Sequence, residues 1–184
     1  MEKVVFLDRD GTINEEIGYL HRIEDCEFVP RAGEAIRLLN EHHYKVFVIT
    51  NQAGVAKGLY QEEDVHILHQ YMQEKLNEMG AFIDGFYYCP YHPDGIVEQY
   101  KRQSDCRKPG IGLIKEVEKT MEIDKANSWM VGDMGSDMQT GRNYGIKTIL
   151  VSTGHGMETY EKQNCPYDYY VKDIYEAVLL LIRQ

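Results

Sequence analysis

The feature of this sequence that most limits its possible folds is a regular alternation of short apolar runs with longer amphipathic segments. The apolar runs predict strands at 4–7, 44–50, 86–89, 128–131, 147–151 and 167–171. Segments with apolar residues at helical spacing predict helices at 31–43, 62–80, 111–121, 137–144 and 173–183. This alternation is typical of α/β proteins, so we expect a doubly wound parallel sheet with helices on both faces.

The length of the chain limits how many domains it forms. Its 184 residues fit a single domain over residues 1–184. The segment 90–109 is the one long irregular stretch between predicted elements, and loops of that length inside a compact domain are usually functional.

The charge and the apolar content exclude two classes of partner. The formal net charge of −10 argues against a nucleic acid, because a phosphate backbone requires a basic surface. No segment is long and apolar enough for a membrane span, and no signal peptide is recognisable at the N-terminus. We therefore expect a cytoplasmic protein, acting as a monomer on a small molecule.

Polar residues follow several of the predicted strands. The segment 8–12 (DRDGT) comes after the first strand, 50–52 (TNQ) after the second and Gly132-Asp133 after the fourth, while Arg107-Lys108 lie in the loop after the third. In a doubly wound sheet, ligands bind beyond the carboxyl ends of the strands. We therefore expect these residues to meet at one edge of the sheet and to form the functional site.

Asp8 and Asp10 suggest the chemistry of that site. Two carboxylates this close repel each other unless a cation or a shared proton intervenes, and Mg²⁺ prefers oxygen ligands of this kind. Asp133 completes a predicted magnesium set with Asp8 and Asp10. A carboxylate nucleophile, Asp8, would form an aspartyl-phosphate, with Asp10 as general acid and base. Lys108 would stabilise the charge of the phosphoryl group.

Simpler interpretations exist for each of these residues taken alone. The two aspartates fit an ordinary turn or a helix cap, and Thr50-Asn51 fit the end of a strand. Lys108 fits a solvated surface position, and so does Lys57, for which we expect no function. The combination of all the motifs in order favours the catalytic interpretation.

The strings 8–12, Thr50-Asn51, Lys108 and Gly132-Asp133 with Asp137 resemble the motifs of the haloacid dehalogenase (HAD) superfamily of phosphatases. Over essentially the whole chain, the sequence further resembles the D-glycero-D-manno-heptose 1,7-bisphosphate phosphatases, in 6–14, Gly18-Tyr19, 50–58, 87–90 and 106–109. The resemblance implies no large cap domain and removal of the 7-phosphate by a magnesium-dependent enzyme. It also implies catalytic roles for Asp8, Asp10, Thr50 and Lys108, and substrate contacts by Arg9, Glu16, Ile17, Gly18, Tyr19, Asn51, Gln52, Ala53 and Arg107.

Two other functions are compatible with the sequence. The histidinol-phosphate phosphatases share the first motif and the Cys-Arg-Lys-Pro string, and are distinguished here by the longer loop after Cys89 and by Gly18-Tyr19. A protein that binds a phosphosugar without turning it over could keep the same fold. A panel of substrates separates these alternatives.

The sequence departs from the family pattern in the loop between Cys89 and Cys106. The family often binds zinc there, but two of the four expected ligand positions hold Tyr91 and Ser104. In a cytoplasmic protein we expect cysteines to be reduced thiols or metal ligands. Cys89, His92 and Cys106 could bind zinc, or packing and hydrogen bonds could hold the loop. A second departure is Met134, where the bisphosphate enzymes typically have a lysine.

Overall fold

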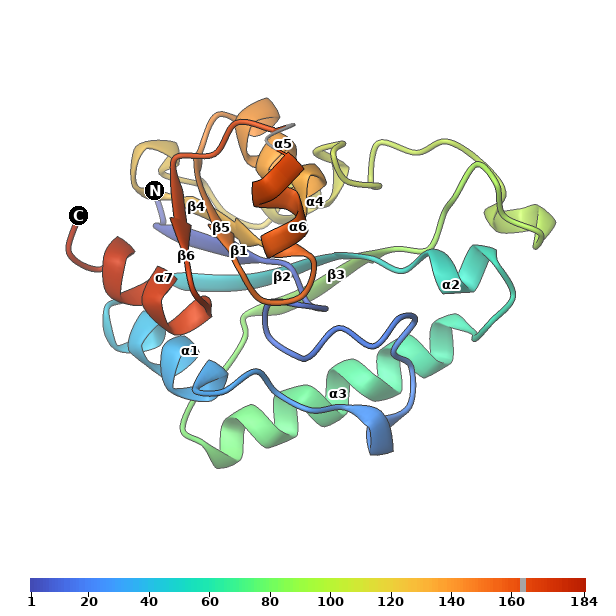
Figure 1. Cartoon of the computed structure of the whole chain (residues 1–184), viewed down its shortest axis with the longest axis horizontal. Helices are drawn as coiled ribbons and strands as arrows, with labels where there is room; N and C mark the ends of the chain where they lie inside the picture. The colour runs from blue at the N-terminus through green and yellow to red at the C-terminus, as the bar shows by residue number, and fades with distance from the viewer. Residues whose placement is uncertain (163–164) are drawn as a thin grey trace.

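The computed structural model describes residues 1–162 and 165–184. Within them, one parallel sheet has the strand order β3–β2–β1–β4–β5–β6 (Figure 1). Its strands are β1 (Val4–Leu7), β2 (Lys45–Asn51), β3 (Gly85–Cys89), β4 (Trp129–Gly132), β5 (Lys147–Val151) and β6 (Tyr169–Val171). The predicted doubly wound α/β fold is confirmed. The order reverses at β1, between β2 and β4, which is where such sheets bind ligands.

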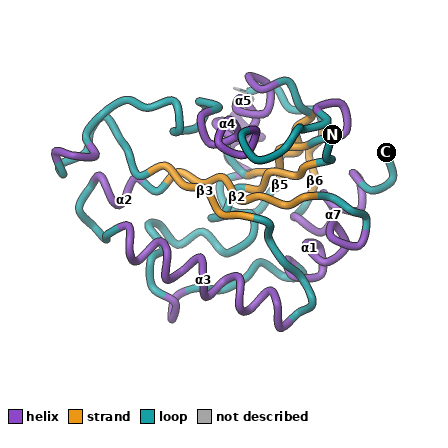
Figure 2. The backbone as a smooth tube through the Cα atoms, turned by 180° about the vertical axis from the view of Figure 1, so that it is seen from behind, coloured by secondary structure: helices purple, strands orange, loops and turns teal. Residues whose placement is uncertain are grey.

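Helices cover both faces of the sheet. Figures 1 and 2 show α1 (Ala32–Glu41), α3 (Glu62–Glu78) and α7 (Ile174–Leu181) on one face, and α4 (Gly112–Glu118) and α5 (Gly135–Tyr144) on the other. Two further helices, α2 (Ala53–Ala56) and α6 (Gly156–Lys162), were not predicted. The four residues of α2 are too few for an apolar period, and α6 buries only Gly156 and Thr159, so its sequence shows no apolar face.

Alternating residues of β1 pack into two separate cores. Val5 and Leu7 belong to the core beneath α1, α3 and α7, whereas Val4 and Phe6 belong to the core beneath α4. All four side chains are fully buried. Each contributes on the order of 1.5–3 kcal/mol by its removal from water. This burial on both faces fixes the register of β1 and therefore the position of the residue that follows it, Asp8.

The long connection after β3 extends away from the sheet. In Figure 1 it forms the yellow-green arch beyond α2, and a short 3₁₀ helix at Glu98–Tyr100 lies on it. The arch returns to the sheet just before α4, at Arg107 and Lys108. None of the helices in the described residues combines the length and the apolar character that crossing a membrane requires.

Candidate active site

Asp8 lies directly after β1, at the carboxyl edge of the sheet. One of its carboxylate oxygens, Oδ1, accepts a hydrogen bond from the backbone N–H of Arg9 at 2.8 Å and lies 2.8 Å from Nζ of Lys108. Both donors reach the same oxygen. No hydrogen bond to the other oxygen, Oδ2, is formed within the described residues, so this atom is available for a ligand.

Lys108 is a buried cation between two carboxylates. Its Nζ lies 2.6 Å from Oδ1 of Asp137 as well as 2.8 Å from Asp8, and its side chain is 2% exposed. Burial alone would lower the pKa of Lys108, but the charges of Asp137 and Asp8 outweigh it and raise the pKa. Lys108 is therefore a fixed positive charge beside Asp8 throughout the physiological range.

Asn51 at the end of β2 holds the backbone of Lys108. Its side-chain Nδ2 donates to the carbonyl oxygen of Lys108 at 3.2 Å, and its Oδ1 accepts from the Lys108 N–H at 2.9 Å. Both ends of the amide are thus occupied by the lysine backbone. Asn51 was predicted to contact substrate; in the structure its side chain positions Lys108 at the edge of the pocket.

Asp8, Asp133 and Asp137 form a buried carboxylate cluster. It is the one group of three or more His, Cys, Asp or Glu side chains in the described residues whose ligand atoms lie within 4.8 Å of one another. Oδ1 of Asp133 is buried and has no hydrogen-bond partner in the described residues. A buried carboxylate oxygen without a partner is costly unless a cation binds it. The oxygen-rich cluster therefore fits Mg²⁺.

The cluster raises the pKa of two of its members. Burial, followed by the charge of Asp137, raises the pKa of Asp8 to about 7, although Lys108 opposes this shift. Burial and then the charges of Asp8 and Asp137 raise the pKa of Asp133 to about 9. The carboxylates therefore repel one another in the absence of a cation.

Two glycines allow the backbone to close around Asp133. Gly11 has φ +77°, and a Cβ at this position would lie 2.3 Å from Oδ2 of Asp133. Gly154, in the loop after β5, has φ +57° and would meet the same oxygen at the same distance. The backbone N–H of His155 then donates to this oxygen at 2.7 Å. Only glycine fits at both positions, because each combines a left-handed backbone with a contact that leaves no room for a side chain.

The Asp10 carboxylate lies outside the cluster, in a network of its own. Asn14 Nδ2 donates to its Oδ1 at 3.0 Å, and Gln52 Nε2 donates to its Oδ2 at 3.1 Å. Arg9 donates to both oxygens, at 3.0–3.2 Å. The carboxylate cluster thus contains Asp8 and Asp133 of the predicted magnesium set, with Asp137 as its third member, and magnesium binding by Asp10 stays a prediction.

The prediction that Arg9 contacts substrate is wrong for its side chain. Arg9 is fully buried, and its guanidinium also contacts His69 Nε2 at 3.2 Å and the carbonyl oxygen of Leu20 at 3.0 Å. Burial, and then the charge of Arg9, lower the pKa of His69 well below its ordinary value. His69 is therefore neutral and can accept a hydrogen bond. These partners satisfy Arg9 in the interior, where it orients the carboxylate of Asp10.

Thr50 and Gln52 continue this network from β2. Gln52 Nε2 also donates to Oγ1 of Thr50 at 2.9 Å, and Oε1 of Gln52 accepts from the hydroxyl of Tyr60 at 2.6 Å. Thr50 and Gln52 are buried, whereas Ala53 at the start of α2 is partly exposed. The three predicted residues are thus brought to the carboxyl edge of β2, beside Asp10.

A disulfide joins Cys89 at the end of β3 to Cys106, two residues before Lys108. Their Cα atoms lie 5.5 Å apart, a separation that suits this bond. The expectation of reduced thiols or metal ligands is therefore wrong for this pair. Both sulfur atoms of the hypothesised zinc set of Cys89, His92 and Cys106 are in this disulfide, and His92 Nδ1 accepts from the N–H of Asp94 at 3.1 Å. A loop closed over 17 residues gains about 3 kcal/mol from such a bond.

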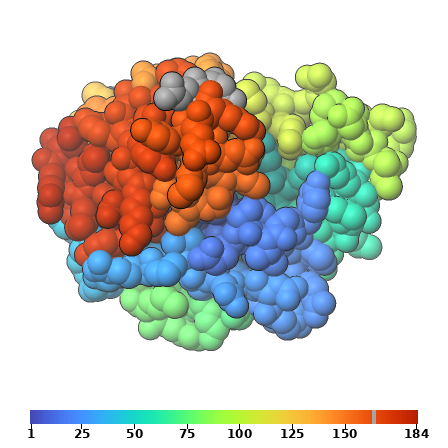
Figure 3. Space-filling model, viewed as in Figure 1, coloured from blue at the N-terminus to red at the C-terminus, as the bar shows by residue number. Residues whose placement is uncertain are grey.

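Two cavities with shared lining residues lie at the carboxyl edge of the sheet, and the inner one contains Asp8 in its wall. The inner one, of about 80 Å³, is lined by Asp8, Asp10, Glu16, Thr50, Asn51, Lys108, Met134 and Ser136. Its volume equals that of roughly two or three waters in the liquid, which suits a phosphoryl group. The outer cavity, of about 510 Å³, shares six of these residues and adds Gly18, Tyr19, Gln52, Ala53, Lys57, Tyr60, His92, Arg107 and His155. Figure 3 shows blue, teal, yellow-green and orange segments meeting on this face.

The cavities show where the remaining predicted substrate-contact residues lie. Glu16, Gly18, Tyr19 and Arg107 line the outer cavity, whereas Ile17 is not part of its wall and is 54% exposed. Lys57, expected to be a solvated surface residue, is part of the wall.

Other residues of the site were not predicted from the sequence. Asn14 donates a hydrogen bond to Asp10, and the backbone N–H of His155 donates one to Asp133. His69 contacts Arg9, which in turn holds Asp10. Asn14 lies four residues from Asp10, so the first motif could have suggested it. His69 lies 60 residues from Arg9 on an amphipathic helix, and the sequence holds no signal for that contact.

Comparison with known proteins adds a second line of evidence. The HAD-hydrolase-like family model matches residues 105–177. A Photorhabdus laumondii protein named D-glycero-beta-D-manno-heptose-1,7-bisphosphate 7-phosphatase is 42% identical over 160 residues, covering 86% of this chain and 85% of its own. A Chlorobaculum tepidum protein named D-glycero-D-manno-heptose-1,7-bisphosphate 7-phosphatase is 39% identical over 183 residues, covering 96% and 92%.

Two solved structures also resemble this chain over nearly its whole length. The D,D-heptose 1,7-bisphosphate phosphatase of B. bronchiseptica, complexed with magnesium and phosphate, superposes with a TM-score of 0.88 at 28% identity, covering 98% of each chain. The D,D-heptose 1,7-bisphosphate phosphatase of Burkholderia thailandensis gives a TM-score of 0.74 at 28% identity over the full length of both chains.

Proposed function

Because this chain belongs to the family of D-glycero-D-manno-heptose-1,7-bisphosphate 7-phosphatases, which are HAD-like hydrolases, we propose that it removes the 7-phosphate of a heptose 1,7-bisphosphate. The observation that carries the proposal is the inner cavity. Its wall contains a carboxylate with one unoccupied oxygen, Asp8, next to a fixed cation, Lys108. A phosphate ester placed there meets a nucleophile and a charge-stabilising group together.

In the proposed first step, the free oxygen of Asp8 attacks phosphorus. The bond between phosphorus and the sugar oxygen breaks, and Asp8 becomes an aspartyl-phosphate. Lys108 stabilises the negative charge on the phosphoryl oxygens from a position that Asn51 and Asp137 fix. The side chain of Thr50 also lines the inner cavity and is a further hydrogen-bond donor to the phosphoryl group.

Asp10 is the proposed general acid and base. It lines both cavities, so it can reach the sugar oxygen, and it gives that oxygen a proton as the bond breaks. A water molecule then attacks the aspartyl-phosphate, transfers a proton to Asp10 and releases inorganic phosphate and free Asp8. Arg9 and Gln52 hold the carboxylate of Asp10 in one orientation during both transfers.

The carboxylates of Asp8 and Asp133 are the proposed magnesium ligands. Oδ1 of Asp133 is buried without a hydrogen-bond partner in the described residues, and the carboxylate of Asp8 lies beside it in the cluster. A bound magnesium ion would neutralise charge on the phosphoryl oxygens and relieve the repulsion between the two carboxylates. Asp137 is committed to Lys108 and to the N–H of Met134, so we assign it a supporting role.

We predict that stabilisation by magnesium increases with pH. In the ion-free protein, Asp8 and Asp133 have pKa values raised from 3.8 to about 7 and about 9. Their protonated forms stabilise the fold fully below about pH 4, and this contribution is lost as the pH rises through 7 and 9. Magnesium requires the deprotonated carboxylates. The increase in Tm on adding MgCl₂ should therefore be small at pH 5.5 and large at pH 8.5.

Asp133→Asn is the control for this titration, because it removes one proposed ligand and should reduce the increase in Tm at both pH values. An increase in the wild type that does not change with pH would contradict the assignment of the buried carboxylates as ligands.

A substrate panel tests the function directly. Two Photorhabdus laumondii relatives, each 42% identical to this chain, are named for different anomers, so the panel includes both anomers of the bisphosphate. It also contains histidinol phosphate and simple sugar phosphates. We expect the highest kcat/KM with a heptose 1,7-bisphosphate and no phosphate release after EDTA treatment. Folded protein that hydrolyses none of these compounds would refute the proposal, and tight binding without turnover would identify a non-catalytic binding protein.

The cellular setting and the assembly of the protein stay predictions. We propose that one domain, residues 1–184, acts in the cytoplasm as a monomer on a phosphorylated sugar, and that it needs no zinc. The disulfide between Cys89 and Cys106 supports the last point, because it occupies the two sulfur atoms that a zinc ion would need. Metal analysis of the purified protein tests it, and one equivalent of zinc would contradict it.

A further inference from the structure

A buried histidine on α3 contacts the arginine that holds Asp10. His69 is 6% exposed, and its Nε2 lies 3.2 Å from Nη1 of Arg9. A guanidinium has five N–H donors and no acceptor, so the histidine nitrogen must accept this hydrogen bond. The imidazole is therefore neutral and carries its proton on Nδ1. His69 lines neither of the two cavities, so it can act on the reaction only through other side chains.

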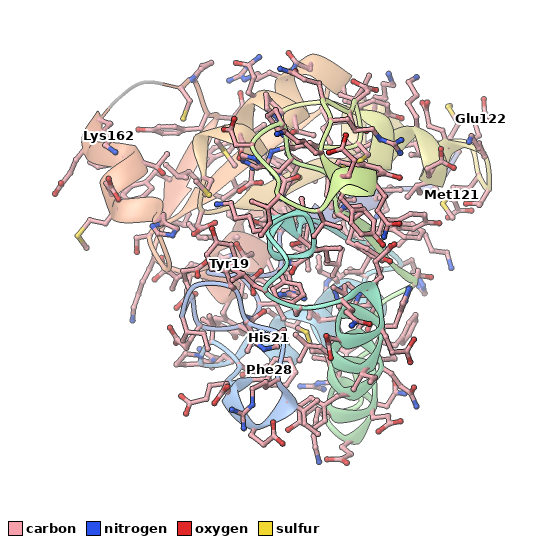
Figure 4. All side chains as sticks on the ribbon, turned by 90° about the vertical axis from the view of Figure 1, so that its right-hand side faces the viewer. Tyr19, His21, Phe28, Met121, Glu122 and Lys162 are labelled. Atoms are coloured by element: carbon pink, nitrogen blue, oxygen red, sulfur yellow. A yellow bond between two sulfur atoms is a disulfide. The ribbon has the colours of Figure 1, made fainter. Side chains whose placement is uncertain are left out.

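Aromatic residues of β3 hold the imidazole in one orientation. The ring of His69 stacks on that of Phe86, with 4.7 Å between the centroids and 24° between the planes, and the ring of Tyr88 meets it edge-on at 6.0 Å. Figure 4 shows α3, in teal to green, beside the loop after β1 on which Tyr19 and His21 are labelled. Packing of this kind locks the rotamer of a supporting side chain, so Nε2 has a fixed direction.

Arg9 connects this histidine to the proposed general acid. Its Nη1 has one hydrogen-bond partner in the described residues, His69, and its Nη2 donates to the carbonyl oxygen of Leu20 at 3.0 Å. The guanidinium also donates to both oxygens of Asp10, at 3.0–3.2 Å. Because a guanidinium is planar and rigid, a rotation at the His69 end would also turn the carboxylate of Asp10. That carboxylate lines the inner cavity.

We propose that His69 is a positioning residue, which acts through Arg9 to keep the carboxylate of Asp10 in the orientation that protonates the leaving sugar oxygen. This inference rests on the proposed function. Without the imidazole acceptor, Nη1 of the fully buried Arg9 loses its partner, and an unpaired buried donor is costly. The guanidinium would then turn toward another acceptor and carry the carboxylate with it. A displacement of about 1 Å in an active site can cost about 10²-fold in rate.

The test compares two leaving groups by kcat/KM, which reports phosphoryl transfer to Asp8 and not the later hydrolysis. A sugar oxygen needs a proton as it leaves, whereas the nitrophenolate of p-nitrophenyl phosphate leaves as a stable anion. His69→Phe removes the acceptor and keeps an aromatic ring against Phe86. We expect it to lower kcat/KM by about 10- to 100-fold for heptose 1,7-bisphosphate and by less than about 3-fold for p-nitrophenyl phosphate.

His69→Gln is the conservative variant, because its amide oxygen can accept from Nη1 of Arg9. It should return kcat/KM for the bisphosphate to within about 3-fold of the wild-type value. His66→Phe is the matched control, three residues earlier on the exposed side of α3, and should leave both values unchanged. A folding defect lowers the values for both substrates equally, so their ratio separates it from the proposed role.

Equal losses on both substrates, no loss on the bisphosphate, or a His69→Gln variant as impaired as His69→Phe would overturn the inference while leaving the proposed function intact. Wild-type protein that hydrolyses no sugar phosphate would refute the proposed function, and this inference would fall with it.

Discussion

Replacing Asp8 with asparagine is expected to lower kcat on the preferred substrate by at least about 10³-fold, because an amide cannot attack phosphorus as a carboxylate does. The loss should occur without a loss of stability. Burial and Asp137 raise the pKa of Asp8 to about 7, so at pH 8 the ionised side chain is unfavourable in the ion-free protein. Asp8→Asn should therefore unfold at the same temperature as the wild type, or higher, at pH 8 without magnesium.

Asp25→Asn is the matched control, since the side chain of Asp25 is 49% exposed. It removes one carboxylate elsewhere and should leave kcat unchanged. Steady-state phosphate release and thermal unfolding, measured on the same preparations, give both readouts. An Asp8→Asn protein that keeps its full kcat would show that the nucleophile is another group. A variant that loses activity and melts well below the wild type would indicate a structural role.

Replacing Lys108 with methionine should affect both catalysis and folding. The loss of a positive charge beside the phosphoryl group should lower kcat by about 10²- to 10³-fold. Asp8 and Asp137 would also lose the cation that lies between them, at 2.8 and 2.6 Å. Removing one partner of a buried ion pair costs about 3 kcal/mol or more. We expect a free energy of unfolding lower than that of the wild type by about this amount at pH 8.

The pH dependence of that destabilisation identifies its cause. Lys108 lowers the pKa of Asp8 in the wild type, so its removal raises that pKa further. Stability from a raised pKa is present at low pH and lost as the pH rises. Urea unfolding should therefore show a smaller defect at pH 5 than at pH 8. Lys119→Met, at a side chain 68% exposed, should show neither effect. A defect independent of pH would point to lost packing instead.

The sequence predicted best those parts of the fold that are buried on both faces. The run at 4–7 matches β1 residue for residue, because the charged residues Lys3 and Asp8 mark both ends of an apolar stretch that is buried on both faces. The position of this run also predicted correctly that Asp8 lies at the carboxyl edge of the sheet. The short helix α2 was missed, because four residues carry no period, and the predicted start of α5 was two residues late. Asp137 lies in the first turn of α5, where its carboxylate accepts a hydrogen bond from the N–H of Met134.

Contacts between distant segments explain the errors at the site. Arg9 follows a strand next to the nucleophile, where a charged residue is naturally interpreted as a substrate contact. Its burial depends on His69 and the carbonyl of Leu20, which only the folded chain brings to it. The spacing of Cys89 and Cys106 is equally compatible with a metal site and with a disulfide. The bond between their sulfur atoms in the folded protein distinguishes the two.

The bond between Cys89 and Cys106 also changes how the chain is connected. It turns the extended arch between β3 and Lys108 into a covalent ring, so the polypeptide has two routes from one side of the active site to the other. A single cut by a protease anywhere from residue 90 to residue 105 would open the ring without separating the halves of the protein. Lys108 would remain tethered two residues from the end of β3, and the arch could tolerate cleavage or insertion that an open loop could not.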